Sequence, residues 1–249
     1  MNEHAKMTAP TAPFKPIDFL PREIDAERRA NGEIILRQRI PLNEYQRCIP
    51  LYLAKWAQER PDQTWLAQRR GPDRAWKRVS YSEAKRDVDA LTQALIDMKL
   101  TPEQPVAILS GNSIEHALMT QAAMQAGIPA APVSPAYSMM SQDHAKLRYI
   151  FDLIKPGVVM VQDGIAFGKA LKALDLTGVT VVHVDRAPEG IPSRAWADLV
   201  ATKRTDAVDK AIAAVGPKTV GKLLFTSGST GMPKAVINTQ EMMCANVVM

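Results

Sequence analysis

Short apolar runs that alternate with helical segments are the feature that most limits the fold of this chain. Residues 105–109, 128–133, 158–161 and 179–184 are each dominated by small apolar or β-branched side chains. Continuous runs of this length predict strands that are buried on both faces. Since helical segments separate the runs, the sequence predicts βαβ units. The expected fold class is α/β, with a largely parallel sheet and helices on both of its faces.

The helical segments carry recognisable signals at their ends. The capping box Ser80-Tyr81-Ser82-Glu83 predicts a helix start, because the serine hydroxyl and the carboxylate each satisfy a free backbone amide. The turn at residues 110–113 predicts the start of the next helix, and Gly127 its end. One apolar stripe follows the capping box at three- and four-residue spacing: Tyr81, Ala84, Val88, Leu91, Leu95 and Met98.

Further elements are predicted from apolar spacing and from breakers. The segment Pro50 to Glu59 predicts a helix that Pro61 stops. Ser141 predicts the N-cap of a helix that Pro156-Gly157 ends. The remaining predictions are strands at 64–68 and 76–79 joined by a turn at 71–73, a helix at 165–174, strands at 223–226 and 235–237, and a helix from 240 to 249.

The N-terminal region differs from the remainder of the chain. Residues 1–45 contain several prolines and one short apolar run, Gly32 to Arg37, and predict an extended arm that carries one strand. Residues 46–249 predict a single α/β domain. No short-period repeat is present, which argues against a solenoid.

Composition excludes several classes of function. The net charge of +5 suggests nucleic acid as a partner, but basic and acidic residues are interspersed, as at residues 22–29, and no aromatic platform accompanies them. A solvated surface is the better interpretation. No apolar run has the roughly 20 residues of a membrane span, and the N-terminus has no secretory h-region. The two cysteines, Cys48 and Cys244, predict free thiols in the reducing cytoplasm.

The four histidines show no metal-ligand spacing, and we assign no metal ligand. The most informative segment joins the two predicted strands that end at Thr226 and begin at Ala235. Glycines let its backbone amides approach a ligand, hydroxyl groups supply donors and Lys234 supplies a positive charge. This combination predicts a polyphosphate-binding loop. The candidate ligand-binding residues are Thr226, Ser227, Gly228, Ser229, Thr230, Gly231 and Lys234.

Two other kinds of loop have a related composition. A plain hairpin loop has a similar composition, but it does not require four hydroxyl groups followed by Pro233-Lys234. A Walker A loop is disfavoured, because Ala235 follows the lysine where a metal-binding serine or threonine is required.

The sequence of this loop resembles the phosphate-binding signature of the adenylate-forming (AMP-binding) superfamily, which includes acyl-CoA synthetases, luciferases and peptide-synthetase adenylation domains. Residues 79–84, 106–113 and 126–137 resemble further family motifs in the family's order. Ala235 departs from the usual glycine. Residues 233–240 and 244–246, together with residues 32–37 and 41–42, are most similar to the branch of bacterial feruloyl-CoA synthetases.

The resemblance implies a two-step reaction. A carboxylic acid, with ferulate-like hydroxycinnamates favoured, attacks the α-phosphate of ATP·Mg²⁺ and gives an acyl-adenylate. Coenzyme A then displaces AMP to form a thioester. By similarity, the seven loop residues hold the terminal phosphates of ATP. They would position the leaving pyrophosphate and stabilise its growing charge. No general acid or base is assigned.

Later family motifs are absent from the sequence. The resemblance therefore implies the N-terminal half of an enzyme whose large domain continues and is followed by a small C-terminal domain. We expect the 249-residue chain to complete neither half-reaction. Alternatives are an adenylation enzyme with a carrier-protein acceptor, a non-catalytic nucleotide-binding protein and, more distantly, nucleic-acid binding. The oligomeric state is not predicted.

Overall fold

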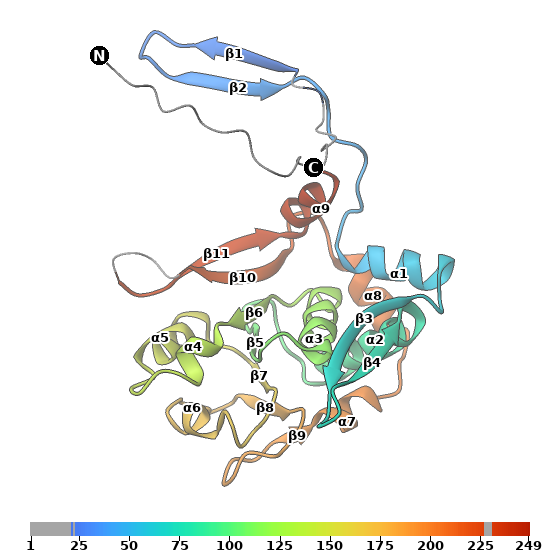
Figure 1. Ribbon diagram of the computed structural model, residues 1–249, viewed down its shortest axis with the longest axis vertical. Helices are drawn as coiled ribbons and strands as arrows, with labels where there is room; N and C mark the ends of the chain where they lie inside the picture. Colours follow the sequence, from blue (N-terminus) through green and yellow to red (C-terminus); the bar gives the residue numbers. More distant parts are fainter. Residues whose placement is uncertain (1–20, 22, 227–230) are drawn as a thin grey trace, which may run out of the picture. The chain divides into compact units, whose positions relative to one another are not determined.

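A computed structural model describes Pro21, residues 23–226 and residues 231–249 of the chain (Figure 1). Its contacts divide it into two compact units, residues 1–43 and residues 44–249.

The first unit contains a two-stranded antiparallel hairpin. Strand β1 (Ile24–Arg28) pairs with strand β2 (Ile34–Gln38), and Gly32 takes a positive φ of 89° in the turn between them. The prediction of one strand was therefore wrong, because β1 is the partner that it omitted. Charged residues alternate along β1 and obscure its strand pattern; one of them, Glu27, accepts a hydrogen bond from Arg37 at 2.6 Å.

The second unit is built on a seven-stranded sheet with the order β11-β10-β6-β5-β7-β8-β9 (Figure 1). All neighbours in it are parallel except β10 and β11, which are antiparallel. This confirms the predicted α/β class with its largely parallel sheet. The strands are β5 (Val106–Leu109), β6 (Ala130–Val133), β7 (Val158–Val161), β8 (Thr180–His183), β9 (Arg194–Ala195), β10 (Val220–Thr226) and β11 (Lys234–Thr239).

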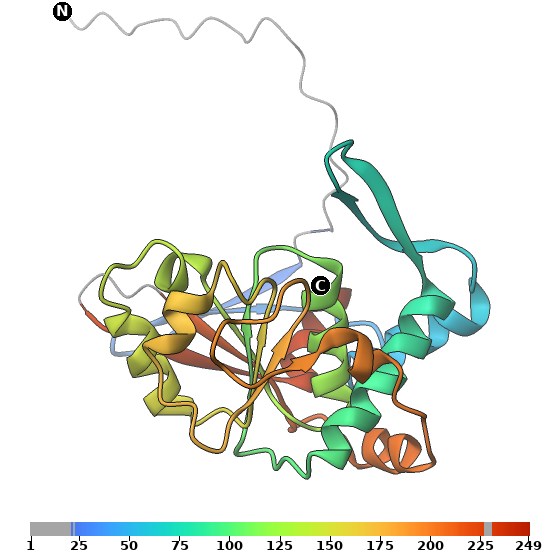
Figure 2. The same ribbon diagram turned by 90° about the horizontal axis from the view of Figure 1, so that it is seen from below.

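Two apolar clusters cover the two faces of this sheet. Alternate side chains explain the division, since Ile108 belongs to one cluster and its neighbours Ala107 and Leu109 to the other. The first cluster includes helices α2 (Tyr81–Asp97) and α3 (Ile114–Gln125), and the second includes α5 (Ala145–Ile154) and α6 (Gly168–Lys172). Figure 2 shows these two groups of helices on opposite sides of the strands.

The remaining elements flank this core. Helix α1 (Pro50–Glu59) has its predicted bounds, and the predicted strand pair is the hairpin β3 (Thr64–Arg70) and β4 (Ala75–Ser80). The capping box at the start of α2 is present in full. The other helices are α4 (Pro135–Ser138), α7 (Trp196–Val200), α8 (Ala207–Ala214) and α9 (Gln240–Val248).

Two helix starts differ from the prediction. Helix α5 begins at Ala145 and its N-cap residue is His144, at a left-handed φ of 52°, whereas Ser141 was predicted as the cap. The Ser141 hydroxyl instead accepts a hydrogen bond from the His144 amide at 3.0 Å. Helix α6 is shorter than the predicted 165–174, because Asp163 accepts the amides of Ile165 and Ala166 and holds that segment in turns.

Close backbone packing requires a glycine in the turn that follows β7. Gly164 donates its amide to the Arg186 carbonyl at 2.7 Å, and a Cβ atom at this position would overlap that carbonyl and the Pro188 nitrogen. We therefore expect Gly164→Ala to lower the free energy of unfolding by roughly 2 kcal/mol, measured by urea denaturation. Gly168→Ala is the control, because a Cβ there meets open space. Equal stability of the two variants would contradict this interpretation.

Candidate functional site

The predicted polyphosphate loop is carried by the hairpin β10–β11. Thr226, the last residue of β10, pairs directly with Lys234, the first residue of β11. The Thr226 hydroxyl lies 3.5 Å from the Lys234 carbonyl oxygen. Lys234 was predicted as a loop residue and is instead the first residue of a strand, because residues 234–236 continue the pairing of residues 224–226.

Of the seven candidate residues, the structure describes Thr226, Gly231 and Lys234, and all three are exposed. Ser227, Gly228, Ser229 and Thr230 lie outside the described residues. A Cβ atom added at Gly231 would meet nothing within 4 Å. In the part of the chain that the structure describes, no carboxylate forms an ion pair with Lys234. Its ammonium group is therefore available to an anion, while buried Pro233 fixes the chain just before it.

The far end of the same hairpin is anchored to the domain. Thr239 is the N-cap of α9, and its hydroxyl accepts the Met242 amide at 3.3 Å. The fully buried Gln240 donates its backbone amide to the Thr219 carbonyl at 2.9 Å and accepts the Ile49 amide through Oε1, also at 2.9 Å. These contacts hold the base of the hairpin while the end with Thr226 and Lys234 stays exposed.

The hairpin carries a second lysine, Lys222 of β10, which was not among the residues predicted from the sequence. Lys222 is half-buried and pairs with Asn238 of β11 and Ala130 of β6, and this burial lowers the pKa of the Lys222 ammonium below its ordinary value. A basic residue between apolar neighbours in a strand is the signal that would have identified it. Of the two lysines on this hairpin, Lys234 is the one exposed to solvent.

A groove of about 800 Å³ extends from Lys234 along one face of the hairpin. Its apolar wall includes Ala235 and Ile237 of β11, Leu223 of β10, and Tyr149 and Leu153 of α5. Lys234 thus lies where an apolar surface meets the predicted phosphate loop.

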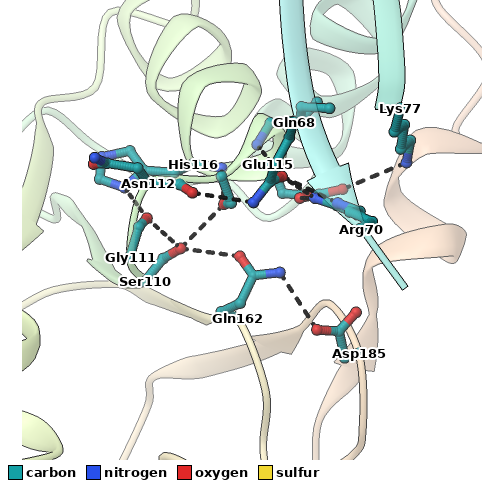
Figure 3. A network of polar contacts seen from close by, with 12 residues as sticks. Gln68, Arg70, Lys77, Ser110, Gly111, Asn112, Glu115, His116, Gln162 and Asp185 are labelled. Atoms are coloured by element: carbon teal, nitrogen blue, oxygen red, sulfur yellow. Dashed lines mark hydrogen bonds and ion pairs between the residues drawn. The ribbon is translucent and has the colours of Figure 1, made fainter. Parts of the chain in front are cut away.

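A polar network lies where β5, β7 and β8 end (Figure 3). Ser110, the residue after β5, donates its hydroxyl to Gln162 Oε1 at 3.0 Å, and Gln162 Nε2 donates to Asp185 at 3.4 Å. Chains leaving β5 and β7 pass to opposite faces of the sheet, and the crevice between such strands is the common ligand site of open α/β sheets. Here it is a cavity of about 380 Å³.

The hairpin β3–β4 is fixed to this crevice by a buried ion pair (Figure 3). Arg70 contacts the Glu115 carboxylate in the first turn of α3, and the Lys77 ammonium lies 3.7 Å from it. Burial alone would raise the pKa of Glu115, but the hydrogen bond and charge of Arg70, with Lys77, outweigh it and lower the pKa. Polar residues directly after buried strands are the signal for this network. Residues 110–113 were predicted only as a turn, and Gln162 and Asp185 were not singled out.

The fold and the loop together define a class of protein. This is an open α/β domain in which a segment rich in glycine and hydroxyl side chains joins two strands at one side of the sheet. A family model described as "AMP-binding enzyme" matches residues 53–249, and the chain belongs to this family.

Curated relatives include a methyl-dioxo-octahydroindenyl-propanoyl:CoA ligase of Mycobacterium tuberculosis. It is 30% identical over 77% of this chain and 36% of its own length. Phosphinothricin tripeptide synthetase PhsB of Streptomyces viridochromogenes is 26% identical over 80% of this chain and 15% of its own length. The chain thus spans about a third or less of these two relatives.

Solved structures share the fold at low identity. A fatty acyl-adenylate ligase from L. pneumophila, solved with acyl adenylate and pyrophosphate, has a TM-score of 0.60 at 16% identity, covering 83% of this chain and 33% of that chain. Acetoacetyl-CoA synthetase from Streptomyces lividans also has a TM-score of 0.60, at 17% identity over 80% of this chain and 31% of that chain. Among the residues described here, no helix has the length and apolar character to cross a membrane.

Proposed function

We propose that the protein carrying this chain activates a carboxylic acid with ATP·Mg²⁺, giving an acyl-adenylate and pyrophosphate. The observation that carries this proposal is the pairing of Thr226 with Lys234, which sets both ends of the glycine- and hydroxyl-rich segment side by side and exposed. Family membership over residues 53–249 supports it independently.

In this reaction an oxygen of the substrate carboxylate bonds to the α-phosphorus while the bond to the pyrophosphate oxygen breaks. The negative charge that develops on the leaving pyrophosphate requires nearby donors. Lys234 and Thr226, with Ser227, Ser229, Thr230 and the amides of Gly228 and Gly231, would supply them as fixed dipoles and one full charge. The exposed Lys234 ammonium, which forms no ion pair with a described carboxylate, suits a guest with many acceptor oxygens.

For the second step we propose coenzyme A as the acceptor and a thioester as the product. The similarity to a CoA ligase over 77% of the chain supports this choice, and the similarity to peptide synthetases keeps a carrier-protein thiol as the second candidate. For the acid we propose a hydroxycinnamate such as ferulate, on the motif similarity around Ala235. Residues 46–249 are proposed to form part of one AMP-binding domain.

ATP–pyrophosphate exchange tests the first step on the protein that carries this chain. We expect exchange that depends on added acid, with ferulate preferred over acetate and a long-chain fatty acid. Preference for one of the other acids would contradict the ferulate assignment alone. ATP binding without exchange for any acid would favour the non-catalytic alternative.

Thioester formation tests the second step separately. Free coenzyme A added to the ferulate reaction is expected to yield AMP and feruloyl-CoA in equal amounts. Release of AMP only when a carrier protein is supplied would contradict coenzyme A as the acceptor and leave the adenylation proposal intact.

A further inference from the structure

The crevice where β5, β7 and β8 end is lined by polar residues and glycines. Its lining residues are Gln68, Arg70, Gly71, Gly111, Asn112, Ser113, Gln162 and Asp185. No described residue of β10 or β11 is among them, so the crevice is separate from the predicted phosphate loop. Its volume of about 380 Å³ is near the lower end of the roughly 300–1,000 Å³ of small-molecule sites, which suits a compact polar guest.

The lining groups of the crevice can be reached from solvent. The Arg70 side chain keeps 28% of its exposure, and both Asn112 and Asp185 are exposed. Hydrogen bonds hold the wall between them in place (Figure 3). Gln68 donates to the Asn112 carbonyl at 3.1 Å, and Gln162 contacts Asp185 at 3.4 Å. The crevice is therefore an open cavity with a fixed polar wall.

The wall formed by the hairpin β3–β4 carries an excess of positive charge. Arg70 and Lys77 both contact the carboxylate of Glu115, and the Lys77 ammonium lies 3.7 Å from it. Two cations share one anion, so these three side chains have a net charge of +1 at pH 7. Ser113, the N-cap of α3, lines the same wall, where the helix dipole adds positive potential.

The loop after β8 carries the opposite excess. Arg186 contacts the Asp163 carboxylate, with 3.0 Å between Nε and Oδ2, and the Asp185 carboxylate also acts on this guanidinium. Two anions share one cation here, so these three side chains have a net charge of −1 at pH 7. Asp185 is the member of this group that lines the crevice. A positive and a negative region thus border one small cavity.

We propose that this crevice binds a small zwitterionic amino acid, with its carboxylate toward Arg70 and the start of α3 and its ammonium group toward Asp185. A simple anion would be repelled by Asp185, and a simple cation by the excess charge of Arg70 and Lys77. A neutral polyol would gain from neither charge, whereas a zwitterion is complementary to both. The proposal is independent of the acid-activating function proposed above.

Saturation-transfer NMR of the protein that carries this chain tests the proposal with L-serine and its two halves. 3-Hydroxypropanoate is serine without the amino group, and ethanolamine is serine without the carboxylate. We expect saturable binding of L-serine and roughly fivefold or more weaker binding of each half, because each half loses one charge-assisted contact. Glycerol, which has hydroxyl groups and no charge, should also bind more weakly. Equal or tighter binding of any of these three compounds would overturn the proposal.

Two variants locate the binding in the crevice. Asp185→Asn should weaken L-serine roughly three- to tenfold without weakening 3-hydroxypropanoate, because only the contact to the ammonium group is lost. Lys77→Gln removes the excess positive charge from outside the crevice and should weaken L-serine roughly twofold without weakening ethanolamine.

Asp198→Asn is the matched control, because Asp198 is an exposed carboxylate on α7 that does not line the crevice. Its replacement should leave the affinity for L-serine unchanged. Equal affinity of the Asp185→Asn and Asp198→Asn proteins for L-serine would place the binding elsewhere and overturn the proposal. Absence of saturable L-serine binding below about 10 mM would also overturn it, since two charge-assisted contacts should exceed that affinity.

Discussion

Replacing Lys234 by alanine is expected to lower the rate of ATP–pyrophosphate exchange roughly 100- to 1,000-fold in the protein that carries this chain. Loss of one fixed donor to a developing charge has an effect of this size in other enzymes. Lys234 is exposed, forms no ion pair with a described carboxylate and lies directly opposite Thr226. Because the lysine acts as a charge, Lys234→Arg should retain a larger part of the rate than Lys234→Ala.

Lys218→Ala is the matched control for this experiment. Lys218 is also exposed, but its ammonium is paired with Glu241 at the other end of the hairpin. Its removal should leave exchange unchanged. Full exchange activity in the Lys234→Ala protein would contradict the proposed phosphate site, whereas an equal loss in both variants would indicate a general effect of surface charge.

Replacing Glu115 by leucine is expected to lower the free energy of unfolding by about 3 kcal/mol at pH 7. Removing one member of a buried ion pair leaves the other charge without compensation and costs about 3–5 kcal/mol. The lower end applies because the Arg70 side chain keeps 28% of its exposure and can be hydrated. Denaturant unfolding of the 249-residue chain, monitored by circular dichroism, measures the change. Glu115→Gln keeps the shape of the side chain and loses its charge. Its free energy of unfolding should lie between those of the parent chain and Glu115→Leu.

The lowered pKa of Glu115 determines how the stability difference between the parent chain and Glu115→Leu changes with pH. Since the pKa of Glu115 is lowered in the folded protein, its stabilising contribution is complete above the unfolded glutamate value of about 4.3. The contribution is lost as the pH falls below that value through the folded pKa. The stability difference between the parent chain and Glu115→Leu should therefore be constant from pH 7 to pH 5 and decrease in more acidic solution.

The exposed pair of Lys210 and Asp206 supplies the control for both measurements. Its two charges are 2.7 Å apart, but both side chains are largely solvated. Asp206→Asn should leave the stability unchanged at pH 7. A Glu115→Leu protein as stable as Asp206→Asn would show that the Arg70 contact does not hold the hairpin β3–β4 in place.

The core strands and main helices were predictable because local pattern and tertiary position agree. Residues 158–161 are apolar throughout and every one of them is buried in β7. The capping box at Ser80 fixed the start of α2, and its apolar stripe faces the sheet. In such segments the spacing of the apolar side chains along the sequence indicates which face of the helix or strand is buried.

Other features were not predictable because their causes are not local. Strand β1 alternates charged residues whose partners lie on β2, and a left-handed His144 moves the start of α5. The ion pair of Arg70 and Glu115 joins a strand of one hairpin to the first turn of α3, so no single window of sequence contains it. For the phosphate loop, the sequence supplied the residue types, and the structure adds the pairing of Thr226 with Lys234.

That pairing has a consequence for how this segment can change in length. Successive side chains of a strand project to opposite sides, so an insertion or deletion of one residue within β10 or β11 would slip the alignment by one step. The side chain of residue 234 would then project from the opposite face of the hairpin. One-residue gains and losses should consequently be rejected within the two paired strands β10 and β11.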